Sequence, residues 1–583
     1  MTWSSGVKRG AIVSALLVVS IVGIGCRQKA TVAPPPLELG TTVKETSPFD
    51  VAMEFLNNLD QYQPELVRMQ ILQNLREWSR LEEADVTWIS DPMFRRLPKE
   101  VKEMFSAEGL ATNVFQPHDA LELQQAVWLR DVANAVARMP VYDPDVRDWL
   151  SQAEKDGVVS GDGMNDLSLA YRLFDWTIRN IELDPEFEDF DIMGGERELE
   201  RRDRNTLRHQ YYPWENLLYG HGDWLERSRV FMLLGRQFGI NIVMLVADRG
   251  DEPQQPWANG VLIDDKLFLF DTRLGLPLPG EDDAQFSTLS DYTANPELLD
   301  QLNVSGERYR IVPSDLERLV ACIDATPAAL SQRMKQIESK LSGERKLALT
   351  VAPTPLAKKV RSNDVSKVEI WTFPYRGYQF FAKLQENPQA ALPLLNALKY
   401  EQTPFENRGP LLRGRLLHLR GYYRGAHDNP GATKLYMDAR MSKKDLQRFN
   451  IPISEVPAGS PLIASLPEDP IERDRVFRLR LQAGRQMAMD GKDRATYWLG
   501  LLSLDRQEFK VAADFLRLNV DDESSDWHQG ARYNLARSLE ALGVRDNDSE
   551  LLKEAIELYG SVEDSPQYVG NLLRQRRLQA KLP

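Results

Sequence analysis

Residues 219–240 read YGHGDWLERSRVFMLLGRQFGI, and this segment decides how the neighbouring chain folds. Its apolar residues recur at the spacing of one face of an α-helix; they are Val230, Phe231, Leu233, Leu234 and Phe238. Gly239 marks the end of the helix, because glycine readily adopts the left-handed conformation that follows many last helical turns. Residues 241–247, NIVMLVA, then combine apolar and β-branched side chains and predict a buried strand.

Two more strands are predicted directly after this one. Residues 258–264, ANGVLID, and residues 266–271, KLFLFD, are separated by little more than a turn at Asp264 and Asp265. A helix followed by an antiparallel run of strands is an α+β arrangement. The expected fold class is therefore α+β, with residues 161–290 as the core and helical regions before and after it.

The helix and strands of this core resemble the transglutaminase-like (papain-like) core. That family carries G-x-C at the start of a buried helix, R-x-x-G-I at its end, and then H-x-W-x-E and an aspartate on the strands. With Arg236 and Gly239 in register, Trp224 occupies the position of the cysteine, two residues after Gly222. The resemblance covers residues 166–279 and implies a helix packed on an antiparallel sheet.

The second half of the family motif is altered as well. Counting back from Asp271 places the family's histidine on Gln255, and its tryptophan and glutamate on Trp257 and Asn259. The family's chemistry needs a thiolate, an imidazole that activates it and a carboxylate that orients the imidazole. Only the carboxylate, Asp271, remains, and a neutral amide cannot act as a base near pH 7. No catalytic residue is therefore expected, and Trp224 is interpreted as filling the former cleft, with a binding platform as the alternative.

Two neighbouring residues keep a catalytic alternative open. His221 precedes Trp224 by three residues, and Ser228 follows it by one helical turn. These two side chains are the candidates for a hydroxyl nucleophile and its base. A histidine in a glycine-flanked loop and a packed serine is the interpretation favoured by the pattern.

The N-terminus predicts export and lipid attachment. A basic pair precedes an apolar run over residues 11–24, which is shorter than the ~20 residues that span a bilayer, and Cys26 follows. This pattern resembles the lipobox of bacterial lipoproteins, although Gly23 stands where leucine is usual. The resemblance implies that residues 1–25 are a signal peptide and that Cys26 is acylated. An ordinary cleaved signal followed by a chance cysteine is the alternative.

Residues 26–47 contain the proline-rich stretch APPPLELG and are expected to form a tether. A lipid on Cys26 and a tether behind it predict an exported protein, anchored by lipid to a membrane of a bacterial cell envelope.

The charge balance argues against nucleic acid as a partner. The chain has 583 residues with a formal net charge of −14, and no stretch interleaves basic residues with aromatic ones. Residues 186–210 are acidic first and basic second, and are interpreted as a solvated excursion rather than a docking site.

The chain has two cysteines, Cys26 and Cys322. If Cys26 carries lipid, the mature chain cannot form an internal disulfide. Cys322 sits among apolar residues at helical spacing, so a buried, inert thiol is favoured over a nucleophile.

Residues 48–160 are expected to be helical. Residues 64–81 place apolar side chains at intervals of three, and a second amphipathic stretch begins at Asp119; the first stripe is Leu66, Met69, Leu72, Leu75 and Trp78. Residues 156–166 lack the oxygen spacing and closing glutamate of a calcium loop, so they predict a turn with Asp166 as helix cap. No metal and no cofactor is expected.

The chain changes character after the core. Residues 291–450 predict a mixed and then helical region, with a helix over 327–343 and short strands over 347–351 and 368–373. Residues 451–470 contain five prolines and are expected to be a linker.

Residues 471–583 predict paired amphipathic helices. Small and large residues stand at packing positions that resemble a tetratricopeptide-type helix pair, namely Gly500, Phe509, Ala512 and Leu516. Ala536, thirty-six residues after Gly500, begins a second and looser copy. Such pairs present a concave face to peptides or proteins, and an unrelated helical bundle is the alternative.

Two functions from different classes follow from these patterns. The favoured one is a cell-envelope lipoprotein with a catalytically degenerate transglutaminase-like core, acting as an interaction or scaffold module with a protein or peptide partner on the C-terminal helices. The alternative is a thiol-independent hydrolase or acyltransferase of the same fold.

Overall fold

The computed structural model describes residues 47–378 and 409–582, except for residues 59–63, 83–85, 185–211, 252–253, 282–284, 426–429, 457–459, 461–462, 464–465 and 562–564. The predicted signal peptide, Cys26, almost all of the predicted tether and the charged stretch 186–210 lie outside the described residues.

The chain divides into two compact units. The first, which contains the large sheet, holds the described residues up to 378 together with 419–421 and 532–582. The second holds residues 409–418 and 422–531. Residues 471–583 are therefore shared between the units, with the division inside helix α22 (His528–Asp546) and not at the predicted linker over 451–470.

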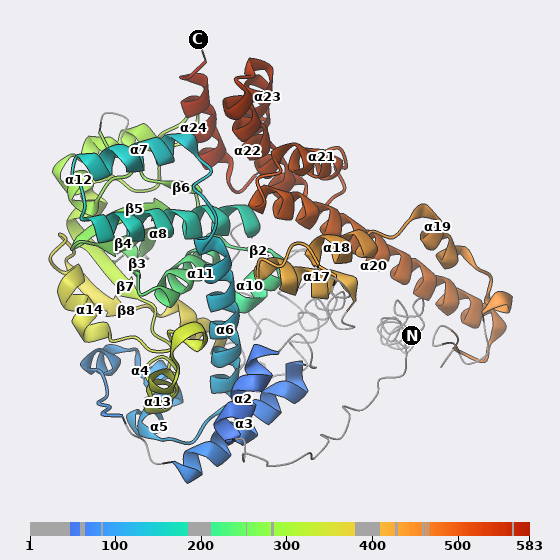
Figure 1. The fold of residues 1–583 in the computed structure, drawn as a ribbon, viewed down its shortest axis with the longest axis horizontal. Coiled ribbons are helices and arrows are strands. Elements are labelled where there is room, and N and C mark those ends of the chain that lie inside the picture. The colour runs from blue at the N-terminus through green and yellow to red at the C-terminus, as the bar shows by residue number, and fades with distance from the viewer. Residues whose placement is uncertain are drawn as a thin grey trace, which may run out of the picture. The chain divides into compact units, whose positions relative to one another are not determined.

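The sheet-containing unit begins with helices, as expected for residues 48–160 (Figure 1). They are α2 (Pro48–Asn57), α3 (Pro64–Leu81), the 3-10 helix η3 (Pro92–Arg96), α4 (Lys99–Met104), α5 (Ala107–Ala111), α6 (Pro117–Ala137) and α7 (Pro144–Lys155).

The buried stripe of α3 differs from the predicted one. The predicted Leu66 and Met69 are 59% and 67% exposed. The apolar residues of α3 that are buried instead follow a spacing of three to four, and they are Val67, Ile71, Leu75 and Trp78. A strict interval of three rotates around a helix with 3.6 residues per turn, so the first members of such a series leave the core.

Helix α8 (Gly161–Asn180) begins five residues before the predicted cap Asp166. Its N-cap is Ser160, whose side chain accepts a hydrogen bond from the backbone N–H of Gly163. The Ser160 hydroxyl and backbone N–H also donate to the carboxylate of Asp264, at 3.0 and 2.5 Å. The prediction of Asp166 was wrong because a contact from a distant turn fixes the start of the helix.

The predicted helix and three strands of the core are confirmed. They are α11 (Trp224–Gln237), β3 (Asn241–Ala247), β4 (Gln255–Ile263) and β5 (Lys266–Asp271). The turn between β4 and β5 holds Asp264 and Asp265 at φ angles of 47° and 61°, which aspartate tolerates better than most residues. Gly239, at φ 76°, follows the end of α11 as predicted.

The large sheet has the order β6-β5-β4-β3-β7-β8, completed by β6 (Leu276–Pro277), β7 (Leu319–Ile323) and β8 (Lys367–Ile370). Its neighbours are antiparallel, except that β7 and β8 are parallel. A small parallel pair, β1 (Glu182–Leu183) and β2 (His221–Gly222), joins the end of α8 to the start of α11, and α10 (Pro213–Tyr219) precedes β2. These elements establish a mixed α+β protein.

A β-bulge interrupts β4 near Trp257. Val246 pairs with Pro256 and Met244 pairs with Asn259, so two residues of β4 lie opposite one residue of β3. The extra residue changes the alternation of side chains between the two faces at this point. Residues before and after the bulge therefore cannot be assigned to a face by counting.

Each face of the sheet is covered by apolar side chains. On one face, the rings of Phe174 from α8 and Phe231 from α11 lie 5.1 and 5.6 Å from the ring of Phe270 on β5. Leu267 and Leu269 of β5 belong to a second apolar cluster, which includes residues of η3, of β3 and β7, and of the helices that follow the sheet.

The segment after β6 departs from its prediction in two places. It contains α12 (Leu289–Ala294), η6 (Pro296–Leu302), η7 (Pro313–Arg318), α13 (Gln332–Lys340), η8 (Gly343–Arg345) and α14 (Pro353–Val360). The helix predicted over 327–343 is the shorter α13, because the Ser331 side chain accepts from the backbone N–H of Met334 and caps it there. Residues 347–351 are not a strand, whereas β8 falls within the predicted 368–373 except for its first residue.

The last helices of the chain pack into the sheet-containing unit. They are the larger part of α22, α23 (Ser549–Gly560) and α24 (Tyr568–Gln579). The Arg227 guanidinium on α11 donates to the Gln567 side chain at 2.8 Å, and Arg537 on α22 forms a buried ion pair with Asp175 on α8 at 2.9 Å. These contacts make the C-terminal helices part of the core.

Gly570 shows how closely α24 approaches the core. A Cβ atom at this position would lie 1.8 Å from the backbone oxygen of Leu274, which is far inside van der Waals contact. Glycine is therefore required here by the close approach of two backbones.

The second unit consists of helices. They are α17 (Pro410–Leu419), α18 (Ala432–Ala439), α19 (Lys443–Leu446), the 3-10 helices η9 (Gln447–Asn450) and η10 (Ile453–Glu455), α20 (Pro470–Asp505) and α21 (Phe509–Val520). Helices α20 and α21 pack together, with the Leu516 side chain against Gly500, two of the positions predicted to pack. Inside this unit, the buried ring of His418 contacts the Asp505 carboxylate at 3.2 Å.

Candidate functional site

Trp224 is the first residue of α11. Asp223 is the N-cap, and Glu226 completes a capping box with it, so the start of the helix is fixed within the chain. The Trp224 side chain is buried, with 5% of the residue exposed. The Arg310 guanidinium lies over the indole, 4.0 Å from the ring centroid, which is cation–π geometry.

Arg310 also connects Trp224 to the sheet. Its Nη2 atom donates to the backbone oxygen of Trp257 on β4 at 3.1 Å. Trp224 and Trp257 are thus joined through one guanidinium, which closes the position where the family's nucleophile would stand.

Asp271 is fully buried at the end of β5, and both oxygens of its carboxylate accept hydrogen bonds from the chain. Oδ1 accepts from the backbone N–H groups of Arg273 and Leu274, and Oδ2 accepts from the Tyr309 hydroxyl at 2.6 Å. The Tyr309 oxygen in turn accepts from Nε1 of Trp257 at 2.9 Å. Burial and the neighbouring Asp271 carboxylate raise the pKa of Tyr309 well above its ordinary value, so its hydroxyl remains a donor.

Gln255 lies apart from this cluster. It is half-buried at the start of β4, and within the described residues its side chain forms one hydrogen bond, from Nε2 to the backbone oxygen of Pro256. The structure therefore brings together Trp224, Trp257 and Asp271, but not Gln255.

Asn259, at the family's glutamate position, is fully buried. In the part of the chain that the structure describes, neither atom of its side-chain amide has a hydrogen-bond partner. A buried amide without partners costs about 1 to 3 kcal/mol of stability. The amide at this position is neutral, so it cannot hold a substrate by charge as the glutamate of the resembling family could.

Ser228 and His221, the candidates for a hydroxyl nucleophile and its base, lie in different surroundings. Ser228 is buried, and its hydroxyl is 2.5 Å from the hydroxyl of Thr272, which donates to the backbone oxygen of Trp224. Nδ1 of His221 is 2.9 Å from the Asp184 carboxylate. No hydrogen bond between Ser228 and His221 is found among the described residues.

Cys322 lies on β7 rather than on a helix, because the short apolar run belongs to the sheet. The thiol is buried, and burial raises its pKa to about 12. A thiol with this pKa stays protonated near pH 7, in agreement with the prediction of an inert cysteine.

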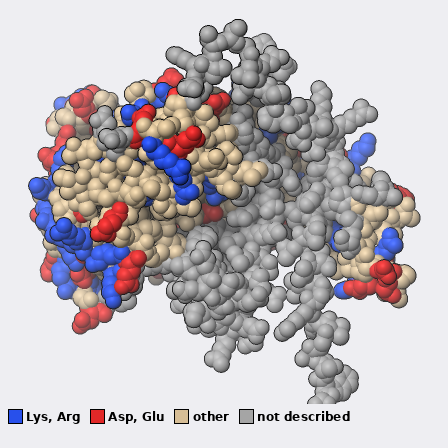
Figure 2. Space-filling model, turned by 90° about the horizontal axis from the view of Figure 1, so that it is seen from below, with Lys and Arg blue, Asp and Glu red and all other residues tan. Residues whose placement is uncertain are grey.

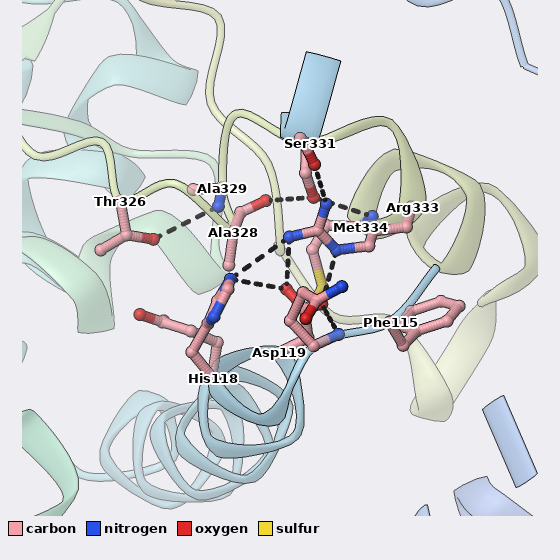
Figure 3. A network of polar contacts seen from close by, with 12 residues as sticks. Phe115, His118, Asp119, Thr326, Ala328, Ala329, Ser331, Arg333 and Met334 are labelled. Atoms are coloured by element: carbon pink, nitrogen blue, oxygen red, sulfur yellow. Dashed lines mark hydrogen bonds and ion pairs between the residues drawn. The ribbon is translucent and has the colours of Figure 1, made fainter. Parts of the chain in front are cut away.

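A buried ion pair connects the N-terminus of α6 to α13 (Figure 3). Nε and Nη2 of Arg333 donate to the two oxygens of Asp119, at 2.5 and 2.9 Å, and Nη1 donates to the Gly109 oxygen. His118 lies beside this pair, 3.3 Å from Arg333. Burial first, and Arg333 to a lesser extent, lowers the pKa of His118, although Asp119 opposes the shift. The network thus joins α5, α6 and α13 through one guanidinium.

A cleft of about 570 Å³ lies in the sheet-containing unit, between α7, η6 and α24. Its charged lining residues are Asp145, Asp148, Arg576, Arg577 and Lys581. The sequence predicts residues 568–579 only as part of the paired helices over 471–583. The basic run RQRR at 574–577 was the available signal, but nothing in the sequence showed that α7 would lie opposite it.

Within the described ranges, no helix is long and apolar enough to cross a membrane, and no group of three or more acidic, histidine or cysteine side chains could hold a metal ion. On the face shown in Figure 2, basic and acidic side chains of the described residues occur side by side. No family model matches the chain, and no curated protein or solved structure matches it either.

Proposed function

We propose that this protein is a lipid-anchored scaffold or interaction module of a bacterial cell envelope, built on a transglutaminase-like core that no longer performs the family's chemistry. The proposal joins the N-terminal pattern ending at Cys26 to the arrangement of residues around Trp224.

The observation that carries the proposal is the enclosure of Trp224. The indole stands where the resemblance places the nucleophile, and the Arg310 guanidinium lies 4.0 Å above it. Asp271, which would orient the base, already accepts hydrogen bonds from Tyr309 and two backbone N–H groups. In this chemistry the nucleophile and the base act as a unit. The residues at the two positions, Trp224 and Gln255, can serve as neither nucleophile nor base.

Activity of the wild-type protein is the direct test. We expect no turnover of γ-glutamyl or peptide substrates and no acyl transfer to an amine. The double variant Trp224→Cys and Gln255→His tests the placement of the motif. Gln255 has no contact with Asp271 in the described structure, so this variant should also be inactive. Turnover by wild-type protein would contradict the proposal.

Lipid attachment is tested separately. Cys26→Ser should release the protein from membranes, because acyl chains supply the binding free energy, about 0.8 kcal/mol for each buried CH2 group. Persistence of the variant on membranes after carbonate washing would replace the lipid anchor with an uncleaved segment.

A second candidate function, a thiol-independent hydrolase or acyltransferase, is favoured by one contact. The Asp184 carboxylate is 2.9 Å from Nδ1 of His221, which is how a carboxylate orients a catalytic imidazole. Activity that is lost in both His221→Ala and Ser228→Ala, but is unaffected by alkylation of thiols, would support this candidate over the scaffold.

A further inference from the structure

The charges that line the cleft beside α24 are not balanced. The Asp145 carboxylate pairs with Lys581, and the Asp148 carboxylate is 3.7 Å from the Arg147 guanidinium. Both acidic side chains of the cleft are thus already paired with cations of the chain. The two remaining cations are Arg576 and Arg577.

Neither of these arginines has a carboxylate partner in the described structure. Arg576 donates to the backbone oxygens of Gln301 and Asn303, which are neutral acceptors. Arg577 forms no hydrogen bond and no ion pair with any described residue. Two adjacent guanidinium groups therefore line the cleft without a carboxylate in contact, and the Asp143 and Asp145 carboxylates act on Arg577 only from beyond ion-pair distance.

The surroundings of Arg577 make an anion favourable there. Arg574, three residues before Arg577 on the same helix, adds a further positive charge. The Arg574 guanidinium lies 3.7 Å from the Asp143 carboxylate. The pKa of Arg577 is lowered, mainly by burial and then by Arg574, although the Asp143 and Asp145 carboxylates and Tyr171 oppose the shift. An unpaired cation in such a place is stabilised by any anion that enters, because desolvation strengthens the attraction.

The cleft also has an apolar side. Leu302 and Leu573 are buried at its wall, and Trp149 is half-buried, with its ring 4.8 Å from the ring of Phe286. An apolar wall beside a few convergent polar groups is the usual composition of a ligand site, and about 570 Å³ is within the usual size.

We propose that this cleft binds a carboxylate carried on an apolar or aromatic body, as in a peptide segment that joins a carboxylate to an aromatic side chain. Arg577 and Arg576 hold the carboxylate, since the planar guanidinium matches its two oxygens. The aromatic body packs on Trp149 and Leu573. The site gives the proposed interaction module a partner of defined chemistry, but its charges do not depend on whether the core is catalytic.

The probe is N-acetyl-4-fluorophenylalanine, followed by fluorine NMR with the full-length chain in detergent. We expect binding that saturates, with an affinity at least tenfold higher than that of N-acetyl-4-fluorophenylalaninamide. The peptide N-acetyl-4-fluorophenylalanyl-glutamate α-amide, in which only the glutamate side chain is a carboxylate, separates a side-chain carboxylate from a terminal one. Tighter binding of either acid identifies the source.

The double variant Arg576→Gln and Arg577→Gln should weaken binding of the acid at least tenfold. Lys358→Gln with Arg361→Gln, at the exposed end of α14, removes two positive charges elsewhere and should leave binding within twofold. Arg577→Glu should instead favour 4-fluorophenethylamine over the acid, a change that loss of folding cannot produce.

Three results would overturn the inference: equal binding of acid and amide, unchanged binding in the Arg576 and Arg577 variant, or tight binding of 4-fluorophenyl phosphate with none of the acid. A failure of this kind leaves the lipid-release and activity tests unaffected, so the two proposals are judged independently.

Discussion

The surroundings of Asp271 and the cleft beside α24 are two polar regions of the same unit, and they treat charge in opposite ways. Asp271 is fully buried, and both of its oxygens accept hydrogen bonds from the chain itself. Arg577 is partly exposed in a cleft and has no such partner among the described residues.

This difference separates a position that resembles an active site from one that can receive a ligand. The chain already makes a cation–π contact at Trp224 and hydrogen bonds at Asp271. A substrate would have to break these contacts in order to bind there. In the cleft, a ligand would make contacts that the chain leaves open. Likeness to a catalytic motif therefore does not by itself locate a ligand site, which has to be argued from the residues that line it.

The largest expected effect tests whether the cleft has a fixed wall. Gly570→Ala places a Cβ against the Leu274 backbone and should destabilise the sheet-containing unit by about 3 kcal/mol. Hydrogen exchange of α24 should rise accordingly. The matched control is Gly491→Ala in α20, where nothing lies within 4 Å of the added Cβ, and where helix propensity should improve by up to about 1 kcal/mol. Equal behaviour of the two variants would show that α24 is not held on the core.

The next effect measures how much the buried Asp271 carboxylate contributes to the free energy of unfolding. Asp271→Asn removes the charge that accepts from Tyr309 and two backbone N–H groups, and should lower the free energy of unfolding by about 2 kcal/mol in urea denaturation. Asp148→Asn, whose side chain is 79% exposed at the cleft, should change it by no more than about 0.5 kcal/mol. A reversed order would contradict the contrast between the two regions.

A smaller effect of opposite sign is expected at Asn259. Its amide has no partner among the described residues, so Asn259→Leu, which has a similar size, should raise the free energy of unfolding by about 1 kcal/mol. A loss of stability in the same denaturation experiment would mean that the amide is hydrogen-bonded in solution.

The smallest effect concerns the dependence of stability on pH. The pKa of His118 is lowered in the folded protein, so the unfolded chain takes up this proton first as the pH falls. The contribution is fully present above the ordinary histidine pKa of about 6.5 and is lost as the pH falls from there toward the folded-state value. The variant His118→Gln should therefore lose less stability than wild-type protein between pH 7 and pH 5, as followed by thermal unfolding. Parallel curves would contradict the burial of this ring.

Local patterns were sufficient to predict the core elements. The apolar spacing before Gly239 and the turn at Asp264 and Asp265 depend on conformational preferences of a few adjacent residues, and the structure has them where predicted. The predicted cap Asp166 failed because Asp264, a hundred residues away, binds the true cap Ser160.

The surroundings of the candidate sites could not be predicted in the same way. Tyr309 and Arg310 lie in a segment without a recognisable motif, and their contacts with Asp271 and Trp224 join residues that are distant in the sequence. The unpaired state of Arg577 depends on which carboxylates α7 presents to α24, a tertiary property that has no local signature.

The close contact between α24 and the backbone at Leu274 also sets an order of events during synthesis. Arg227 contacts Gln567 across 340 residues, so the middle of the chain cannot complete its packing until its last helix has been made. Distant contacts of this kind slow folding, because a long loop must close before they form. If the chain is exported before it folds, the sheet can complete its packing with α24 only on the far side of the membrane. A nascent chain that stops before residue 570 would leave apolar side chains of the sheet open to aggregation or proteolysis.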